Sequence, residues 1–215
     1  ENEVKGTVKG EAKVGFNFFA PKGKKAEDVI TYEVKAVVAG ISQKDFLHKF
    51  DIAGASGSVN VDNNGIEFSG IGDVNGANVS KSTVKYLFTP EKGIDTILDI
   101  SATCATENLK RFGYPEFPFM KGTLGVNAKV RLGDKAEQVE AALNLGDTEI
   151  NLENIGWQKP TGEVAEFELA TEKKDGVLKI NSFSLSGKKI NAKGSAALSQ
   201  DFSTIASLNL GKFSL

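Results

Sequence analysis

Residues 123–132 read TLGVNAKVRL, and this stretch decides the fold class of the chain. Its apolar residues occupy every second position, at Leu124, Val126, Ala128, Val130 and Leu132. Polar residues lie between them, at Asn127, Lys129 and Arg131. A period of two is typical of a β-strand, whose side chains alternate between a dry face and a wet face. The stretch therefore predicts a strand with one apolar and one polar side.

The same alternation recurs along the chain, for example in VITYEVKAV (29–37) and in residues 94–100. Hairpin signals separate these runs at intervals of about 8 to 14 residues, which is typical of an antiparallel meander. We expect turns with positive φ at residues 62–65 (DNNG), 146–147 (GD) and 173–176 (KKDG). The alternation slips near Asn181 and Ser182, which predicts a β-bulge. The sequence thus predicts an all-β, mainly antiparallel fold of about a dozen strands.

Helical signals are short. Residues 106–113 (TENLKRFG) predict a helix with Thr106 as its N-cap, Leu109 and Phe112 facing inward, and Gly113 at its end. Residues 43–50 (QKDFLHKF) predict a second one. Neither is long enough to cover a dozen strands. The dry face must therefore be covered by a second sheet, in a sandwich or barrel, or be left as a groove for a ligand. The alternation itself does not choose between these two architectures.

Composition excludes several classes of function. The chain of 215 residues has 40% hydrophobic residues and a net charge of −2, and only two of its 26 basic residues are arginine, so we expect no nucleic-acid partner. Cys104 is the only cysteine, so no intrachain disulfide can form. No run approaches the roughly 20 apolar residues of a membrane span. The chain opens without methionine, and we interpret it as a fragment of a longer protein.

The candidates for catalysis are weak. His48, the only histidine, could meet Cys104 as a dyad, but the surrounding SATCATE offers no oxyanion hole. We expect Cys104 to be a buried apolar residue and His48 to lie on the surface. Residues 70–76 (GIGDVNG) lack the helix of a phosphate-binding loop, and the DNNG turn lacks the distal glutamate of a calcium loop. We therefore expect no catalytic residue, no metal and no cofactor.

Acidic residues leave one enzymatic alternative open. A hydrolase could use a carboxylate pair about 5 to 10 Å apart. Most acidic residues, such as Glu163, Glu166 and Glu168, alternate with apolar ones, which is typical of the solvated face of a strand. A hydrolase with such a pair is our second alternative.

Residues 156–169 (GWQKPTGEVAEFEL) contain the only tryptophan, and each residue of the motif has a local role. Pro160 removes a ladder donor where a strand starts, and Gly162 permits a turn. We expect Trp157 to pack across the end of the sheet. The stretch is therefore predicted to be a structural corner and not a binding site.

The last third of the chain resembles the AsmA-like superfamily, in particular its large envelope proteins of the YhdP and TamB type. Three motifs carry this resemblance. The corner matches at Gly156, Trp157, Lys159, Pro160 and Gly162, the following hairpin arm at Asp175, Gly176, Leu178, Ile180, Phe183, Leu185 and Gly187, and the next strand at Ala192, Gly194, Ala196 and Leu198. Residues 32–42 and 57–79 are similar to the domain that precedes this module, and residues 107–130 are similar to its short helix and following strand. The resemblance implies a β-rich domain over residues 1–120 and the AsmA-like C-terminal β-module over residues 121–215, either as separate domains or as one continuous sheet.

The resemblance implies a curled, trough-like sheet that needs no catalytic group. Phospholipid acyl chains would lie in this trough as they cross the periplasm of Gram-negative bacteria between the inner and outer membranes. Further implied partners are neighbouring β-segments of the same longer chain and the inner membrane, through an anchor outside these residues. The predicted groove residues are Val126, Val130, Leu143, Ile150, Leu152, Phe167, Leu169, Leu178 and Ile180. The alternative from another class is a structural or adhesive β-sandwich or solenoid module without lipid.

Overall fold

The computed structural model describes residues 3–16, 30–46, 50–114, 116–134, 136–174, 177–198 and 205–214. The strands of the first half are β1 (Lys5–Phe16), β2 (Ile30–Phe46), β3 (Phe50–Asp62), β4 (Gly65–Val74), β5 (Ala77–Glu91) and β6 (Ile94–Ala105). Those of the second half are β7 (Met120–Leu132), β8 (Ala136–Asn144), β9 (Thr148–Leu152), β10 (Trp157–Lys159), β11 (Ala165–Lys174), β12 (Val177–Gly187), β13 (Ile190–Leu198) and β14 (Ile205–Ser214). Two 3₁₀ helices interrupt them, η2 (Thr106–Phe112) and η3 (Glu153–Ile155).

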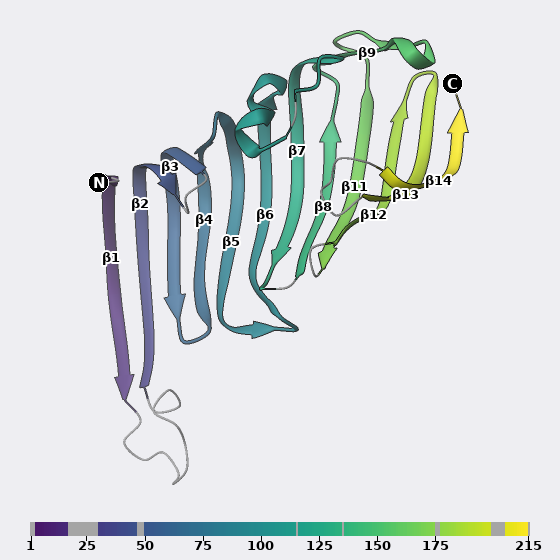
Figure 1. The fold of residues 1–215 in the computed structure, drawn as a ribbon. Helices are drawn as coiled ribbons and strands as arrows, with labels where there is room; N and C mark the ends of the chain where they lie inside the picture. The colour runs from purple at the N-terminus through teal and green to yellow at the C-terminus, as the bar shows by residue number, and fades with distance from the viewer. Residues whose placement is uncertain are drawn as a thin grey trace.

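The strands form one open antiparallel sheet. Its hydrogen-bonded order is β1 to β8, then β11 to β14, while β9 pairs with β7 and with β10. Figure 1 shows the strands side by side in chain order, from β1 at one edge to β14 at the other, with the sheet curling toward the β14 edge. This confirms the predicted all-β antiparallel fold with an open, trough-like sheet. The described strands do not form the two facing sheets of a sandwich.

The pairing register divides the side chains between two faces, because residues directly opposite each other in antiparallel strands project to the same side. One row of such partners crosses every strand of the main order. It consists of Gly10, Ala36, Val59, Phe68, Val84, Leu98, Val130, Val139, Thr171, Ile180, Ala196 and Leu208. The next row on the same side consists of Val8, Val38, Gly57, Gly70, Ser82, Ile100, Ala128, Ala141, Leu169, Phe183, Gly194 and Leu210. We call the side that carries these two rows the apolar face.

The opposite side is polar. Most members of a row across it are polar, and the exceptions are Ile97 on β6 and Ala197 on β13. The row consists of Glu11, Lys35, Asn60, Glu67, Lys85, Ile97, Arg131, Gln138, Glu172, Lys179, Ala197 and Ser207. Acidic and basic residues alternate along much of this row, and Lys85 forms an ion pair with Glu67 across the strands at 2.8 Å. Such alternation suits a face in contact with water, because unlike charges on neighbouring strands attract one another.

A cap covers one end of the apolar face. The chain leaves the sheet after β8, forms β9, η3 and β10, and returns to β11 directly opposite, where the Leu145 amide donates to the Ala165 carbonyl at 2.9 Å. We call residues 145–164 the cap. Its underside and the sheet share the main buried cluster, formed by Leu124, Leu145, Ile150, Trp157, Ala165 and Ile190. In Figure 1 the cap, which contains β9, lies at the upper end of the strands.

The predicted helices are partly corrected. Residues 106–112 form η2, and Gly113 ends it in the left-handed conformation with φ 86°. The N-cap, however, is Ala105 and not Thr106. The helix predicted over residues 43–50 is wrong for 43–46, which belong to β2, and residues 47–49 lie outside the described ranges. Pairing with β3 extends β2 there, since Gln43 lies opposite Ile52. A strand partner supplies more backbone hydrogen bonds than one isolated turn of helix can.

Turns are found at residues 63–64 and 146–147, but the second joins β8 to β9, which do not pair as a hairpin, and the positive φ angles are elsewhere. Residues 63–64 connect β3 to β4, yet no residue of 62–65 or 146–147 has positive φ. Positive φ at two consecutive residues occurs instead in the turns Asn75-Gly76 and Lys92-Gly93, where such a pair matches the twist of a tight hairpin. Of the third predicted turn, at residues 173–176, residues 173–174 belong to β11 and residues 175–176 lie outside the described ranges.

Two further predictions concern β12 and the domain boundary. The pairing of β12 with β13 shifts between Ile180 and Phe183, and that with β11 shifts at Thr171, so the predicted bulge at Asn181-Ser182 is confirmed. At the predicted boundary between residues 120 and 121 the sheet is continuous, because β6 pairs with β7 along its length.

Candidate functional site

The apolar face is largely uncovered by other elements. Extensive contacts between described elements are made by neighbouring strands of the sheet. The remaining ones involve the cap or η2. Side chains near the middle, such as Tyr86, and at the edges, such as Val8 and Leu210, remain 48%, 64% and 51% exposed. An exposed, contiguous apolar surface on a soluble domain usually marks a binding site. This face is therefore the candidate functional site.

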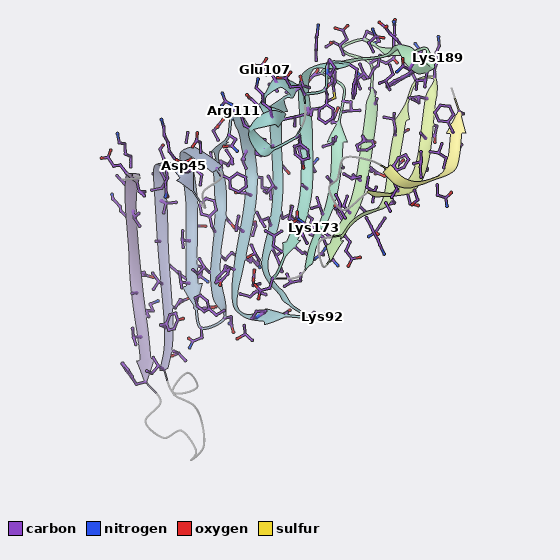
Figure 2. All side chains as sticks on the ribbon, viewed as in Figure 1. Asp45, Lys92, Glu107, Arg111, Lys173 and Lys189 are labelled. Atoms are coloured by element: carbon purple, nitrogen blue, oxygen red, sulfur yellow. The ribbon has the colours of Figure 1, made fainter. Side chains whose placement is uncertain are left out.

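The ends of the strands are polar. Figure 2 labels six charged residues, namely Asp45, Lys92, Glu107, Arg111, Lys173 and Lys189, which lie toward the two ends of the strands. Lys92 and Lys189 belong to hairpin turns, and Glu107 and Arg111 belong to η2. The apolar face is thus bordered by charged groups that could contact the polar part of an amphipathic ligand while its apolar part lies on the strands.

The nine predicted groove residues fall into two groups. Five lie in the buried cluster or pack against it, namely Val126, Leu143, Ile150, Leu152 and Phe167. Ile150 and Leu152 belong to β9 of the cap and not to the main sheet. The other four lie on the apolar face outside this cluster, namely Val130, Leu169, Leu178 and Ile180. Of the first group, Ile150 is buried and the other four residues are partly buried.

The prediction missed the first half of the apolar face. The row that contains Val130 continues through Leu98, Val84, Phe68 and Val59 toward the β1 edge. The alternation of apolar and polar residues in 84–88 and 94–100 indicated that these strands also have an apolar side. The register that joins these strands to β7, however, is fixed by pairing between distant segments and cannot be obtained from the period alone.

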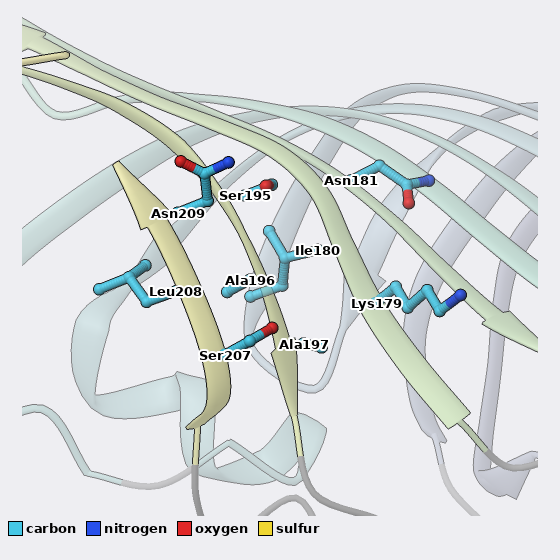
Figure 3. A pocket seen from close by; sticks show the side chains of 9 residues that line it. All are labelled: Lys179, Ile180, Asn181, Ser195, Ala196, Ala197, Ser207, Leu208 and Asn209. Atoms are coloured by element: carbon cyan, nitrogen blue, oxygen red, sulfur yellow. The ribbon is translucent and has the colours of Figure 1, made fainter. Parts of the chain in front are cut away.

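Two shallow pockets lie on the described surface. One, of about 340 Å³, lies on the neighbouring strands β12, β13 and β14 (Figure 3). Ile180, Ala196 and Leu208, which are the last three members of the row through Val130, contribute to its lining. The other, of about 440 Å³, lies between Pro118-Phe119 and residues 151–155.

Cys104, for which we expected no catalytic role, lies in the interior of the structure. Cys104 is 4% exposed and pairs with Leu124 across β6 and β7, so its predicted burial is confirmed. Burial, and secondarily the charge of Asp73, raise the pKa of the Cys104 thiol, which keeps it protonated. His48 lies outside the described residues. Within the described ranges, no three His, Cys, Asp or Glu side chains are grouped in a way that could hold a metal ion.

The other motifs are also parts of the sheet. The Asp62 carboxylate accepts hydrogen bonds from the amides of Asn64 and Gly65 at 2.7 and 3.2 Å, which stabilises the DNNG turn. Residues 70–74 of the glycine-rich stretch belong to β4. Glu166 and Glu168 are exposed and lie opposite Ser186 and Ser184 on the polar face.

The predicted corner is the centre of the cap. Trp157 is 3% exposed and belongs to the buried cluster, and its indole N–H donates to the Lys188 carbonyl at 3.3 Å. Trp157 therefore packs across the end of the sheet, as predicted. Gly162 has φ 88°, and its amide donates to the Gly146 carbonyl at 2.8 Å. Pro160 follows β10 and does not begin a strand, so that detail of the prediction is wrong.

Lys159 is a buried residue whose burial the sequence did not reveal. Its side chain is 1% exposed, and its ammonium group donates to the carbonyls of Gly146, Thr148 and Pro160 at 3.3, 2.6 and 3.1 Å. Burial lowers the pKa of Lys159, and the charges of Glu163 and Asp147 oppose this effect. All three acceptors belong to the cap, as Lys159 itself does. Lys159 therefore stabilises the fold of the cap and does not face a ligand.

In the part of the chain that the structure describes, no helix is long and apolar enough to cross a membrane. Comparisons with protein-family models, with curated proteins and with solved structures gave no match to this chain. The AsmA-like assignment therefore stays a prediction from the sequence motifs.

Proposed function

We propose that this chain is a non-enzymatic, lipid-binding segment of a Gram-negative envelope protein, and that phospholipid acyl chains lie along its apolar face. One observation carries the proposal: two successive rows of mostly apolar partners cross the twelve strands of the main order of an open sheet. The resemblance to AsmA-like proteins supports the periplasmic setting and transfer between the inner and outer membranes. Its partners are then phospholipid and neighbouring β-segments of a longer chain.

The physical basis is burial of apolar area. Each Å² of apolar surface removed from water contributes roughly 25 cal/mol, whichever atoms supply it. Successive members of a row are mostly Val, Leu, Ile, Phe and Ala, so neighbouring positions along the row bind an acyl chain with similar strength. A lipid can then move along the row without crossing a large barrier. The polar face, with its alternating charges, remains in water. Covering this face with another part of the sheet would therefore not be favourable.

The experiment is native mass spectrometry of the chain purified without detergent, followed by lipid extraction. Val130→Asp places a charge in the middle of the apolar row, between Leu98 and Val139. The matched control is Asn127→Asp in the same strand but on the polar face, where the Asn127 side chain accepts a hydrogen bond from Ser101 at 2.7 Å and a carboxylate can do the same. Phe167 is less suitable, because it packs against the buried cluster and its replacement would also disturb the cap.

We expect phospholipid on the unmodified chain and on Asn127→Asp, and loss of at least about nine-tenths of it on Val130→Asp, since a charge on the row costs more than 1.4 kcal/mol, a factor of ten. Circular dichroism and Trp157 emission verify that both variants are folded. Equal lipid on the two folded variants would contradict the proposal. A chain free of lipid would support the structural or adhesive module instead.

A further inference from the structure

The apolar face carries two opposite charges at the end of the strands that lies away from the cap. Glu137 of β8 and Lys173 of β11 are directly opposite each other in the pairing register. Both project to the apolar side, because they lie two residues from Val139 and Thr171, which belong to the row through Val130. Glu137 is exposed and Lys173 is half-buried. The face is therefore not uniformly apolar.

The charged pair interrupts a third row of partners on this side, in which it lies between Leu132 and Leu178. The row consists of Ala12, Val34, Val61, Ile66, Tyr86, Thr96, Leu132, Glu137, Lys173 and Leu178. The next-to-last pair of the β3–β4 hairpin is Val61 with Ile66, whereas the same pair of β11 and β12 is Lys173 with Leu178. The end of a strand does not by itself account for the charges.

The position of the pair suits the polar part of a lipid. The cap occupies the apolar face at the other end of these strands, where Ile150 and Trp157 are buried against the sheet. Because β11 starts beside the cap at Ala165 and ends at Lys174, Lys173 lies at the end away from the cap (Figure 2). Removing a charged headgroup from water is unfavourable, so the headgroup of a lipid on this face belongs at the open end.

The two charges favour one kind of headgroup. The Lys173 ammonium group can donate to phosphate oxygens, and the Glu137 carboxylate can accept from an ammonium group. Opposite residues have Cβ atoms about 4.5 to 5.5 Å apart, so a phosphate and an ammonium group joined by a short ethanolamine linker can reach both side chains. A headgroup with phosphate but no ammonium group would bring its negative charge close to Glu137. The pair therefore favours a zwitterionic headgroup over an anionic one.

We propose that Glu137 and Lys173 bind the headgroup of an ethanolamine phospholipid, with Lys173 at the phosphate and Glu137 at the ammonium group. This inference rests on the proposed function and deepens it, because it names the headgroup of the lipid whose acyl chains lie on the apolar face. The pair then orients the lipid, with its headgroup at the open end of the strands and its acyl chains over the rows.

The test measures which lipid the folded chain selects. The chain, purified without detergent, is incubated with equimolar phosphatidylethanolamine and phosphatidylglycerol that carry identical acyl chains. Native mass spectrometry then gives the total lipid bound and the ratio of the two lipids. The variants Glu137→Gln and Lys173→Gln each remove one charge of the pair. The matched controls, Glu140→Gln on β8 and Lys129→Gln on β7, remove the same charges from the polar face, and circular dichroism verifies folding.

We expect the unmodified chain and both controls to prefer phosphatidylethanolamine by a factor of about three or more, as a partly exposed ion pair would give. Glu137→Gln should bring the ratio close to one, because the ammonium group loses its partner and the anionic lipid is no longer repelled. Lys173→Gln should lower the binding of both lipids by similar factors and keep the preference, because both headgroups contain phosphate. Residues that only stabilise the sheet would not separate selectivity from total binding in this way.

Other results would overturn the inference and leave the proposed function in place. Lipid bound without preference, an unchanged preference in Glu137→Gln, or an equal loss of preference in Glu140→Gln would show that the pair does not select the headgroup. Unchanged total binding in Lys173→Gln would show that Lys173 does not hold the phosphate. Absence of both lipids from the unmodified chain would instead contradict the proposed function, and this inference with it.

Discussion

Among the described lysines, Lys159 has the environment that differs most from the usual exposed position of this residue type. A buried ammonium group is unfavourable unless hydrogen bonds replace its water, and here three carbonyl groups do so. Its position in the sequence, between Trp157 and Pro160, gives no sign of burial, since lysine is almost always exposed. The corner itself could be predicted from local turn chemistry. The burial of the Lys159 side chain depends on its hydrogen bonds to the turn of residues 146–148. These residues come close to Lys159 only in the folded cap.

Replacement of Lys159 should therefore have an effect that depends on pH. We expect Lys159→Met to lower the free energy of unfolding by about 2 kcal/mol, because it leaves buried carbonyl groups without a donor. The pKa of Lys159 in the folded chain is below the ordinary 10.5, so between these two values the unfolded state binds more protons. The unmodified chain then gains stability as the pH rises through this window, and the methionine variant does not.

Urea unfolding at about pH 7.5 and about pH 10 measures this difference. The gap between the unmodified chain and Lys159→Met should be larger at the higher pH. Lys121→Met, which removes an exposed lysine, is the control and should change stability by less than about 0.5 kcal/mol at both pH values. A gap that is constant or smaller at high pH would mean that the Lys159 ammonium group is not desolvated.

At the scale of elements, the cap is an insertion between two strands that are already paired. The end of β8 and the start of β11 lie opposite each other, so a tight turn would suffice to connect them. The inserted residues instead fold back over the apolar face and bury Leu124, Leu145 and Ile190. The sequence predicted that this stretch ends and begins strands, but not that it lies over the sheet. Three residues of β10 are too few for periodicity to reveal a strand.

Trp157 should anchor the cap. We expect Trp157→Ala to cost about 3 to 5 kcal/mol, because it removes the largest side chain of the buried cluster and leaves a cavity. Trp157→Phe keeps an aromatic ring but loses the hydrogen bond to the Lys188 carbonyl, so its cost should be smaller. Urea unfolding followed by circular dichroism measures both variants without relying on tryptophan emission.

The matched control for the cap is Val164→Ala, whose side chain is 73% exposed and should contribute less than about 0.5 kcal/mol. If Trp157→Ala costs no more than this control, the cap is not held on the sheet by its tryptophan, and the buried cluster has a different centre.

At the scale of the whole molecule, the sequence predicted strands but not what covers them. Alternation in TLGVNAKVRL requires a dry face, and a sandwich and a trough both provide one. The choice depends on whether strands far apart in the chain face each other or lie side by side, which is a property of long-range pairing. The helix predicted over residues 43–50 is wrong over 43–46 for the same reason, because pairing with β3 decides the structure there. The trough was expected from the family resemblance, and the open sheet agrees with that expectation.

The dimensions of the sheet bear on how many lipids it can hold. Strands lie about 4.8 Å apart, so the twelve strands of the main order extend over roughly 53 Å along the rows. The acyl chains of one leaflet occupy about half of a hydrocarbon core of about 30 Å, or about 15 Å. If acyl chains lie along the rows, one chain of this protein has room for more than one phospholipid.

We therefore expect native mass spectra recorded with excess phospholipid to contain successive adducts that differ by one lipid mass, with at least two lipids per chain. Val130→Asp divides the row through its middle and should lower the maximum number without abolishing every adduct at high lipid concentration. Asn127→Asp, on the polar face, should leave the series unchanged. A series that stops at one lipid in the unmodified chain would mean that the ligand occupies a single local site, such as the pocket on β12 to β14, and that the rows do not act as a continuous binding surface.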